Sequence, residues 1–421
     1  MRPEAQTPLS QRTGIPRPRY AERIGLVKLT KAAEAGYDLR PLWQHLIAKL
    51  LDGTIEPGEG LDLSLIAQLL GDKAAGLAIQ QAILASNQLF RSPCAAKPPH
   101  LRVLALAAAT DMGSNTPIEF LIENSGIELT TLYVMPEIDW PDRLPDHDVA
   151  IVIASNSEDC RGALDKIARV TPNLPRPLLN PPELVGNLDR DKLHGLLGGI
   201  EGLEIPVTTG ATREQLLELS QSTLALTDIH ADLVFPIIVR PRGSHAGAGL
   251  AKIDDLSGVE RYLGERAEEE FFLSRFVDYS GSDGLFRKCR IVFIDGQPYA
   301  CHLAIAERWD IWYMNAGMSA SASKRAEEEA FMQTFDSGFS QRQRAALSAL
   351  TKRVGLDYFT IDCAETKQGS LLIFEADNTA IVHDMDPPDI FPYKAPQMQK
   401  VFAAFAAMLH ERAVRSREAA A

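Results

Sequence analysis

From Tyr358 to Ala380 the sequence reads YFTIDCAETKQGSLLIFEADNTA, with strand-forming residues on either side of Gln368-Gly369. A two-residue turn, in which the glycine takes a positive φ, would fold these two runs into an antiparallel hairpin. Such a turn places Lys367 opposite Ser370, and this pairing sets the register of the whole hairpin. The stretch therefore predicts two neighbouring strands whose facing residues can be counted from the turn.

The counted register gathers acidic residues on one face. Asp362 faces Glu375 and Thr360 faces Asp377, so alternation along each strand puts the three carboxylates on the same side. Facing side chains lie about 4.5–5.5 Å apart at Cβ, where like charges repel, so a cation or a shared proton is required. Hard oxygen ligands suit Mg²⁺, although a strand face turned to water would carry the same residues. The opposite face is expected to belong to the core and carries Phe359, Ile361, Cys363, Phe374 and Ala376.

Composition narrows the classes of protein. A chain of 421 residues, 45% of them hydrophobic, can fold as two or three domains with sizeable cores. The net charge of −13 argues against nucleic-acid binding, which needs a basic surface. Five scattered cysteines form neither a disulfide framework nor a zinc motif, which favours reduced thiols and a cytoplasmic location. The sequence has no signal-like segment and no apolar run of membrane-spanning length, so we expect no membrane partner.

Two segments precede the part that carries the acidic hairpin. Residues 1–20 are rich in proline and arginine and are predicted to be disordered. Residues 21–98 repeat leucines at helical spacing, which predicts a helical module for packing or dimerisation, with a homo-oligomer as one outcome. Residues 99–185 predict a small α/β domain: a buried strand from Leu101, a loop at Asp111–Asn115, a helix capped by Thr116, and a second strand at Leu129–Met135.

A glycine-rich loop and a second hairpin follow in the last segment. The strand Leu233–Arg240 leads into PRGSHAGAGL, residues 241–250, whose backbone N–H groups could wrap phosphate oxygens, although an ordinary hairpin loop is the alternative. Its glycine spacing matches neither the Rossmann nor the Walker pattern. A turn at Asp295-Gly296 predicts a hairpin in which Arg290 and His302 lie on opposite faces, barring a bulge.

Taken in order, these pieces resemble the ATP-grasp superfamily, which includes glutathione synthetases, D-alanine–D-alanine ligases and the ligases that add glutamate to a ribosomal protein. The resemblance runs from about Asn187 to the end of the chain, with a matching α/β domain before it. It is carried by Asp191-Lys192 at a helix start, the Phe235–Gly249 loop, the Glu270–Val277 strand, the Arg290–Tyr299 hairpin and the acidic hairpin from Asp362 to Glu375.

The resemblance implies an ATP site built from three segments. Two basic residues would hold the α- and β-phosphates, namely Lys192 and Arg240. The loop over the γ-phosphate would use Ser244, His245 and Gly247. The backbone that meets the adenine would belong to Ser274, Arg275 and Phe276.

The resemblance also implies a metal site and catalytic residues. The ligands of Mg²⁺, or of Mn²⁺, would be Asp362, Glu375 and either Asp377 or Asn378. The γ-phosphate or the substrate would meet Arg290 and Asn315. The sequence departs from the family in two places: relatives usually have lysine where Arg240 stands, and some have an arginine where Thr360 stands.

The expected protein is thus an α/β ATP-grasp chain, divided into a tail (1–20), a helical module (21–98), an α/β domain (99–185) and a nucleotide-binding catalytic domain (186–421). The implied activity is an ATP- and Mg²⁺-dependent ligase. It would join a carboxylate of a small molecule or peptide to an amine or a thiol through an acyl phosphate, with release of ADP and phosphate. A non-catalytic ATP-binding module is the alternative, and a helical scaffold without ATP affinity is a third.

Overall fold

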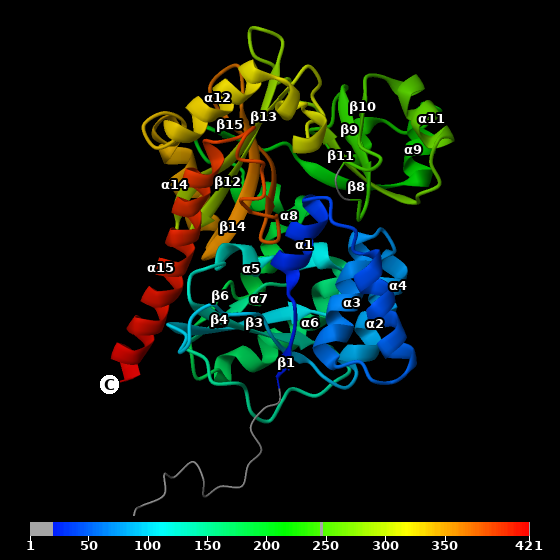
Figure 1. Cartoon of the computed structure of the whole chain (residues 1–421). Coiled ribbons are helices and arrows are strands. Elements are labelled where there is room, and N and C mark those ends of the chain that lie inside the picture. The colour runs from blue at the N-terminus through cyan, green and yellow to red at the C-terminus, as the bar shows by residue number, and fades with distance from the viewer. Residues whose placement is uncertain (1–19, 245–246, 421) are drawn as a thin grey trace, which may run out of the picture.

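The computed structural model describes residues 20–244 and 247–420, in which helices alternate with the strands of three sheets (Figure 1). This arrangement confirms the predicted α/β class. Of the tail expected to be disordered, only Tyr20 lies within the described residues, so that expectation stays a prediction. Within the described ranges, no helix is both long and apolar enough to cross a membrane.

The N-terminal helices pack around one buried member of their own group. They are α1 (Leu26–Glu34), α2 (Arg40–Leu51), α3 (Pro57–Leu69) and α4 (Lys73–Leu84). Helix α3 is buried on most sides because its glycines admit close neighbours. A Cβ on Gly58 would lie 1.7 Å from the carbonyl oxygen of Glu22, and a Cβ on Gly60 would lie 2.4 Å from Cδ1 of Ile83. This part of the chain also gives strands β1 (Ala21–Glu22) and β2 (Leu89–Arg91) to the first sheet.

The first sheet has the strand order β1-β2-β4-β3-β5-β6. Its core is the predicted βαβ unit, in which β3 (Leu101–Ala108) runs parallel to β4 (Ile127–Val134) and β5 (Val149–Val152). The connecting helix α5 (Ile118–Leu121) is a single turn, and the prediction that Thr116 caps it is wrong. The Thr116 hydroxyl instead donates to the carbonyl oxygen of Asn378 at 2.7 Å, which joins this sheet to the end of the acidic hairpin. The remaining elements here are α6 (Glu158–Val170), β6 (Leu178–Leu179) and α7 (Pro182–Val185).

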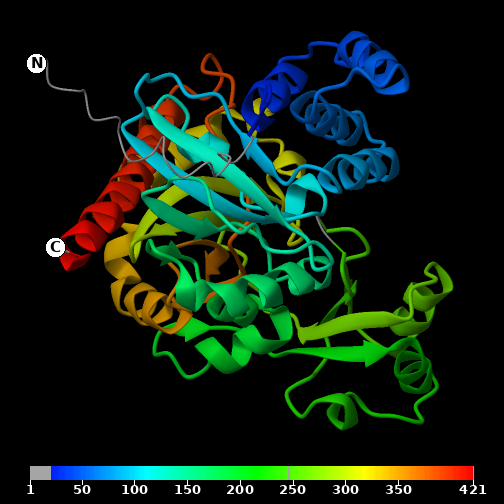
Figure 2. The same cartoon turned by 90° about the horizontal axis from the view of Figure 1, so that it is seen from below.

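Two further sheets form a smaller and a larger lobe. The smaller lobe has the order β10-β9-β11-β8, and α9 and α11 cover one face of it around Leu216, Val259 and Phe271. The larger lobe has the order β13-β12-β14-β15-β7. Figure 2 shows the N-terminal helices and the smaller lobe on one side of the molecule and α15 along the opposite side, as Figure 1 does.

The elements of the two lobes have these bounds. The smaller lobe contains β8 (Thr208–Thr212), α9 (Arg213–Ser220), α10 (Leu226–Ile229), β9 (Ile237–Pro241), β10 (Ala251–Ile253), α11 (Leu256–Gly264) and β11 (Glu270–Arg275). The larger lobe contains α8 (Arg190–Leu197), β7 (Leu203–Glu204), β12 (Phe286–Ile294), β13 (Gln297–Ala306), α12 (Ala322–Gln333), α13 (Phe339–Arg342), α14 (Arg344–Val354), β14 (Tyr358–Glu365), β15 (Leu371–Asp377) and α15 (Lys394–Ala420).

The acidic hairpin has the predicted carboxylate register but a different turn. Asp362 pairs with Glu375, and Thr360 pairs with Asp377, as counted from the sequence. The turn itself is wider, because the N–H of Thr366 donates to the carbonyl oxygen of Ser370, which leaves three residues in the loop. A β-bulge between the turn and the carboxylates adds one residue to β15 and compensates for the wider turn.

The bulge also corrects the prediction for Phe374. Its ring was assigned to the core face, but it packs on Tyr279 with ring centroids 5.0 Å apart, in a cluster with Ala364 and Leu372. The extra residue in β15 reverses the alternation at this point, so Phe374 lies on the same side as the carboxylates. The other predicted core residues of this hairpin, Phe359, Ile361, Cys363 and Ala376, belong to the main core.

The second hairpin turns at Asp295-Gly296 as predicted, with φ of 46° and 80° at these residues. The prediction that Arg290 and His302 lie on opposite faces is wrong. A bulge shifts the register between Arg290 and Ile291, and Arg290 pairs directly with His302. Both side chains therefore point to the same face of the larger lobe.

Candidate active site

Four paired residues form a row across the larger lobe. Glu375 on β15 pairs with Asp362 on β14, which pairs with Arg290 on β12, which pairs with His302 on β13. Because directly paired residues share one face of a sheet, acidic, basic and imidazole groups lie side by side here. The sequence predicts the acidic end of the row, and the bulge in the second hairpin adds the histidine.

Asp362 is the most strongly held carboxylate of the row. Its side chain is 4% exposed and accepts two bonds from the Arg290 guanidinium, at 2.8 and 3.2 Å, while the ammonium of Lys288 lies 2.8 Å away. Burial acts to raise the pKa of Asp362, but the charges of Arg290 and Lys288 outweigh burial and hold that pKa well below its ordinary value. The cation that the facing carboxylates require is thus supplied by the protein itself.

Glu375 faces a second group of cations. Its carboxylate contacts the guanidinium of Arg190 from the start of α8, and Arg240 on β9 is close enough to interact with both. Burial acts to raise the pKa of Glu375, yet Arg190 holds it below the ordinary value. Burial and the charge of Arg190 lower the pKa of Arg240 to about 10. Two arginines from different lobes therefore meet at one carboxylate.

Sequence reasoning missed Arg190 and Lys288. Lys192 is the residue expected in the site from α8, but its side chain is 59% exposed and its ammonium lies 2.6 Å from Asp189. Residues two apart on a helix point in different directions, so α8 directs Arg190 toward Glu375, whereas Lys192 contacts Asp189. Lys288 could have been found, because it lies two residues before Arg290 on one strand and so on the same face.

The glycine-rich loop begins beside this group. The Arg240 guanidinium donates from Nε to the Ser244 hydroxyl at 3.2 Å and also contacts the Ser244 carbonyl oxygen. Gly247 has a φ of 75°, a conformation that suits glycine. His245 lies outside the described residues, so its predicted contact with phosphate stays a prediction.

The strand that was expected to meet adenine also joins the two lobes. Arg275 on β11 of the smaller lobe forms an ion pair at 2.6 Å with Glu204 on β7 of the larger lobe. The Phe276 ring packs against Trp309 at 5.8 Å, with the ammonium of Lys252 5.0 Å from the ring. Ser274 pairs with Thr208 and Ile238 within the sheet. None of these contacts tests the predicted adenine contacts, which stay a prediction.

Two other predicted residues have local partners. The Asn315 amide accepts from the N–H of Trp312 at 3.1 Å and donates to the carbonyl oxygen of Asp310 at 2.9 Å, so it holds its own turn. Asp377 accepts from the N–H of Thr379 at 2.7 Å, and burial raises its pKa. The Asn378 amide donates to the carbonyl oxygen of Ala154, two residues after β5, at 2.9 Å.

The fit of a metal ion can be tested on these positions. In the described part of the chain, no three histidine, cysteine or acidic side chains converge on one point, so the three predicted carboxylates do not form a ready-made cage. Mg²⁺ is usually held by one or two carboxylates together with substrate phosphates. Asp362 and Glu375, paired directly on neighbouring strands, fit that requirement.

The class that fold and site define is an α/β protein in which basic residues from two lobes meet paired carboxylates. No protein-family model matches the sequence, and no curated protein matches it. Among solved structures, the chain is similar to a RimK-domain ATP-grasp protein from Sphaerobacter thermophilus, with 16% identity, coverage of 73% of this chain and 99% of that one, and a TM-score of 0.42.

A D-alanine–D-alanine ligase from Bacillus anthracis in complex with ATP is also similar, with 13% identity, coverage of 76% and 98%, and a TM-score of 0.43. D-cycloserine synthetase gives 16% identity, coverage of 73% and 99%, and a TM-score of 0.41. The first of the three carries the name of the superfamily that the sequence resembles. At these TM-scores, function has to rest on the residues of this chain.

Proposed function

We propose that this protein is an ATP-dependent ligase that joins a carboxylate to an amine or a thiol. The observation that supports this most is the charge of the group of residues around Asp362 and Glu375. Arg190, Arg240, Lys288 and Arg290 gather around Asp362 and Glu375, in a chain whose net charge is −13. A local excess of positive charge on an acidic protein suits a polyanionic ligand such as a triphosphate.

The ion pairs of this site would rearrange when ATP binds. Phosphate oxygens would compete with Glu375 for Arg190 and Arg240, because guanidinium groups bind phosphate as they bind carboxylate. The phosphate oxygens would likewise compete with Asp362 for Lys288 and Arg290. Glu375 and Asp362 would then be free to hold Mg²⁺, which neutralises charge on a triphosphate. The Ser244–Gly249 loop would lie over the outer phosphates, and Phe276 with its neighbours would lie beside the adenine.

The proposed reaction needs little covalent chemistry from the protein. An oxygen of the substrate carboxylate attacks the γ-phosphorus, the bond to the ADP oxygen breaks, and an acyl phosphate forms. The amine or thiol then attacks the acyl carbon, and phosphate leaves with the original carboxylate oxygen. Arg290 and Lys288 would stabilise the negative charge that moves between these groups, and positioning would supply most of the acceleration.

The test is a screen for ADP release against panels of amino acids and short peptides, in the presence of Mg²⁺ or Mn²⁺. A carboxylate labelled with ¹⁸O should transfer one labelled oxygen to inorganic phosphate. Release of AMP and pyrophosphate would exclude the proposed chemistry. ATP binding without ADP release from any substrate would favour the non-catalytic module, and absence of ATP binding would contradict both.

A further inference from the structure

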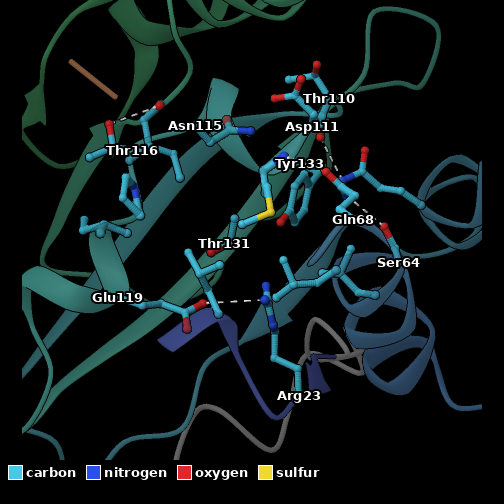
Figure 3. Close-up of a pocket in the computed structure, with 18 of the residues that line it drawn as sticks. Arg23, Ser64, Gln68, Thr110, Asp111, Asn115, Thr116, Glu119, Thr131 and Tyr133 are labelled. Atoms are coloured by element: carbon cyan, nitrogen blue, oxygen red, sulfur yellow. Dashed lines mark hydrogen bonds and ion pairs between the residues drawn. The ribbon is translucent and has the colours of Figure 1, made fainter. Parts of the chain in front are cut away.

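A separate cavity of about 70 Å³ lies between the N-terminal helices and the first sheet (Figure 3). Helix α3 lines one side through Ser64 and Gln68, and the sheet lines the other through Thr131 and Tyr133 on β4. The loop after β3 also borders it, at the carboxyl end of a parallel strand, where open α/β sheets place ligands. None of the row residues lines it, so this cavity is distinct from the proposed ATP cleft.

Arg23 points into this cavity with unmet hydrogen-bond capacity. Its side chain is 6% exposed, and its Nε has no hydrogen-bond partner among the described residues. The nearest carboxylate oxygens belong to Asp62 at 3.5 Å and Glu119 at 3.8 Å, distances too long for N–H···O bonds. The guanidinium interacts with Tyr133, Asp62 and Glu119, but its Nε–H lacks an acceptor. A buried N–H without an acceptor is costly, so an acceptor oxygen inside the cavity would stabilise it.

The two carboxylates near Arg23 already have other donors. Asp62 accepts from the N–H groups of Ile24 and Gly25, and Glu119 accepts from the Ser92 hydroxyl at 2.9 Å. Asp111, the other lining carboxylate, is paired with Lys73, so Arg23 beside Glu119 and the nearby Asp62 leaves an excess of negative charge around the cavity. A simple anion would therefore be repelled by Glu119 and Asp62, whereas a zwitterion would balance both charges.

The Tyr133 hydroxyl completes the recognition pattern. Figure 3 shows it directed toward Arg23 from the opposite wall, and the two groups interact. Burial raises the pKa of Tyr133, so the hydroxyl keeps its proton and can donate. A ligand carboxylate could then receive bonds from Arg23 and Tyr133, while an ammonium lies beside Glu119. The apolar wall at Leu65 and Met112 leaves room for a short side chain.

We propose that this cavity is a binding site for a small α-amino acid of the size of glycine or alanine. The volume of about 70 Å³ limits the size of the ligand, since it is well below the ~150 Å³ of an engineered cavity that binds benzene. The site reaches the larger lobe through one contact: Thr116, which lines the cavity, donates to the Asn378 carbonyl oxygen beside Asp377.

The test uses the full-length chain with glycine and L-alanine as probes, and NMR saturation transfer and calorimetry measure their binding. Tyr133→Phe removes only the hydroxyl and should weaken binding about tenfold, the value of one hydrogen bond to a charged group. Arg23→Met should abolish binding. If Arg23→Met does not fold, Tyr133→Phe alone tests the proposal. Tyr37→Phe, at a tyrosine that is 72% exposed on the same helical module, should bind as the parent does.

Three results would overturn the proposal: no binding at millimolar concentration, equal binding by the parent and Tyr133→Phe, or a crystal grown with glycine that holds only water in the cavity. Arg240→Met separates this site from the ATP cleft. That variant should lose Mg-ATP binding under the proposed function and keep amino-acid binding, so either hypothesis can fail without the other.

Discussion

Replacing Glu375 with glutamine removes one half of its ion pair with Arg190. A carboxylate with a lowered folded-state pKa stabilises the fold above its unfolded pKa, and that contribution disappears as pH falls through the folded pKa. We expect Glu375→Gln to lose about 1 kcal/mol at pH 7. The loss should shrink at pH values below 4.5, the ordinary pKa of the group.

Urea unfolding of parent and variant across this pH range measures the effect. Glu365→Gln is the matched control, because Glu365 pairs with Arg342 at the surface and belongs to the same hairpin. A gain in stability at pH 7 for Glu375→Gln would mean that repulsion from Asp362 outweighs attraction to Arg190.

Arg190 and Lys192 offer a second comparison at single residues. Both lie on α8, but the Arg190 guanidinium contacts Glu375, while Lys192 pairs with Asp189. Loss of a charged hydrogen bond to phosphate costs about tenfold in affinity. We expect Arg190→Met to weaken Mg-ATP binding at least by that factor and Lys192→Met to weaken it less, as measured by calorimetry. The opposite order would favour the role that the family resemblance gives to Lys192.

Among the elements, helix α3 and helix α8 differ in how much they tolerate an added methyl group. A Cβ at position 58 would overlap the Glu22 carbonyl oxygen at 1.7 Å, whereas one at Gly195 meets nothing within 4 Å among the described residues. We expect Gly58→Ala to destabilise the chain by at least about 2 kcal/mol. Gly195→Ala should stabilise it by about 0.5–1 kcal/mol, because alanine favours a helix more than glycine does. Thermal unfolding of the two variants tests this contrast directly.

The hairpins explain how much of the site could be predicted from the sequence. The Asp362–Glu375 pairing was predictable because turn and strands are adjacent in the chain. The wider turn shifts the register of the hairpin by one residue, and the bulge happens to shift it back by one. The Arg290–His302 pairing was not predictable, because a count from the Asp295-Gly296 turn cannot show a bulge inside the strands. The α/β class followed from strand and helix periodicity alone. The contact of Arg190 with Glu375 was not predictable, because it depends on how α8 packs against the rest of the chain.

At the scale of the whole molecule, Arg275 and Glu204 connect the lobes through an ion pair at 2.6 Å. Strand β11 leads from the smaller lobe into the larger one, so this pair limits their relative motion. We expect Arg275→Met to increase the rate of limited proteolysis between the lobes, with Mg-ATP restoring protection. Arg342→Met, which breaks a pair inside the larger lobe, is the control and should leave that rate unchanged. Equal rates for both variants would contradict the expectation that the Arg275–Glu204 pair limits the relative motion of the lobes.

The row from Glu375 to Arg290 has one more consequence, which concerns the order in which ligands arrive. Without ligand, its acidic and basic groups satisfy each other. Under the proposed function, Mg²⁺ alone would have to displace arginines from the carboxylates, and ATP alone would have to displace carboxylates from the arginines. Each ligand therefore removes the obstacle to the other, and by reciprocity Mg²⁺ must raise the affinity for ATP by the same factor by which ATP raises the affinity for Mg²⁺. The ion-paired residues would thus favour binding of Mg²⁺ and ATP together over binding of either one alone.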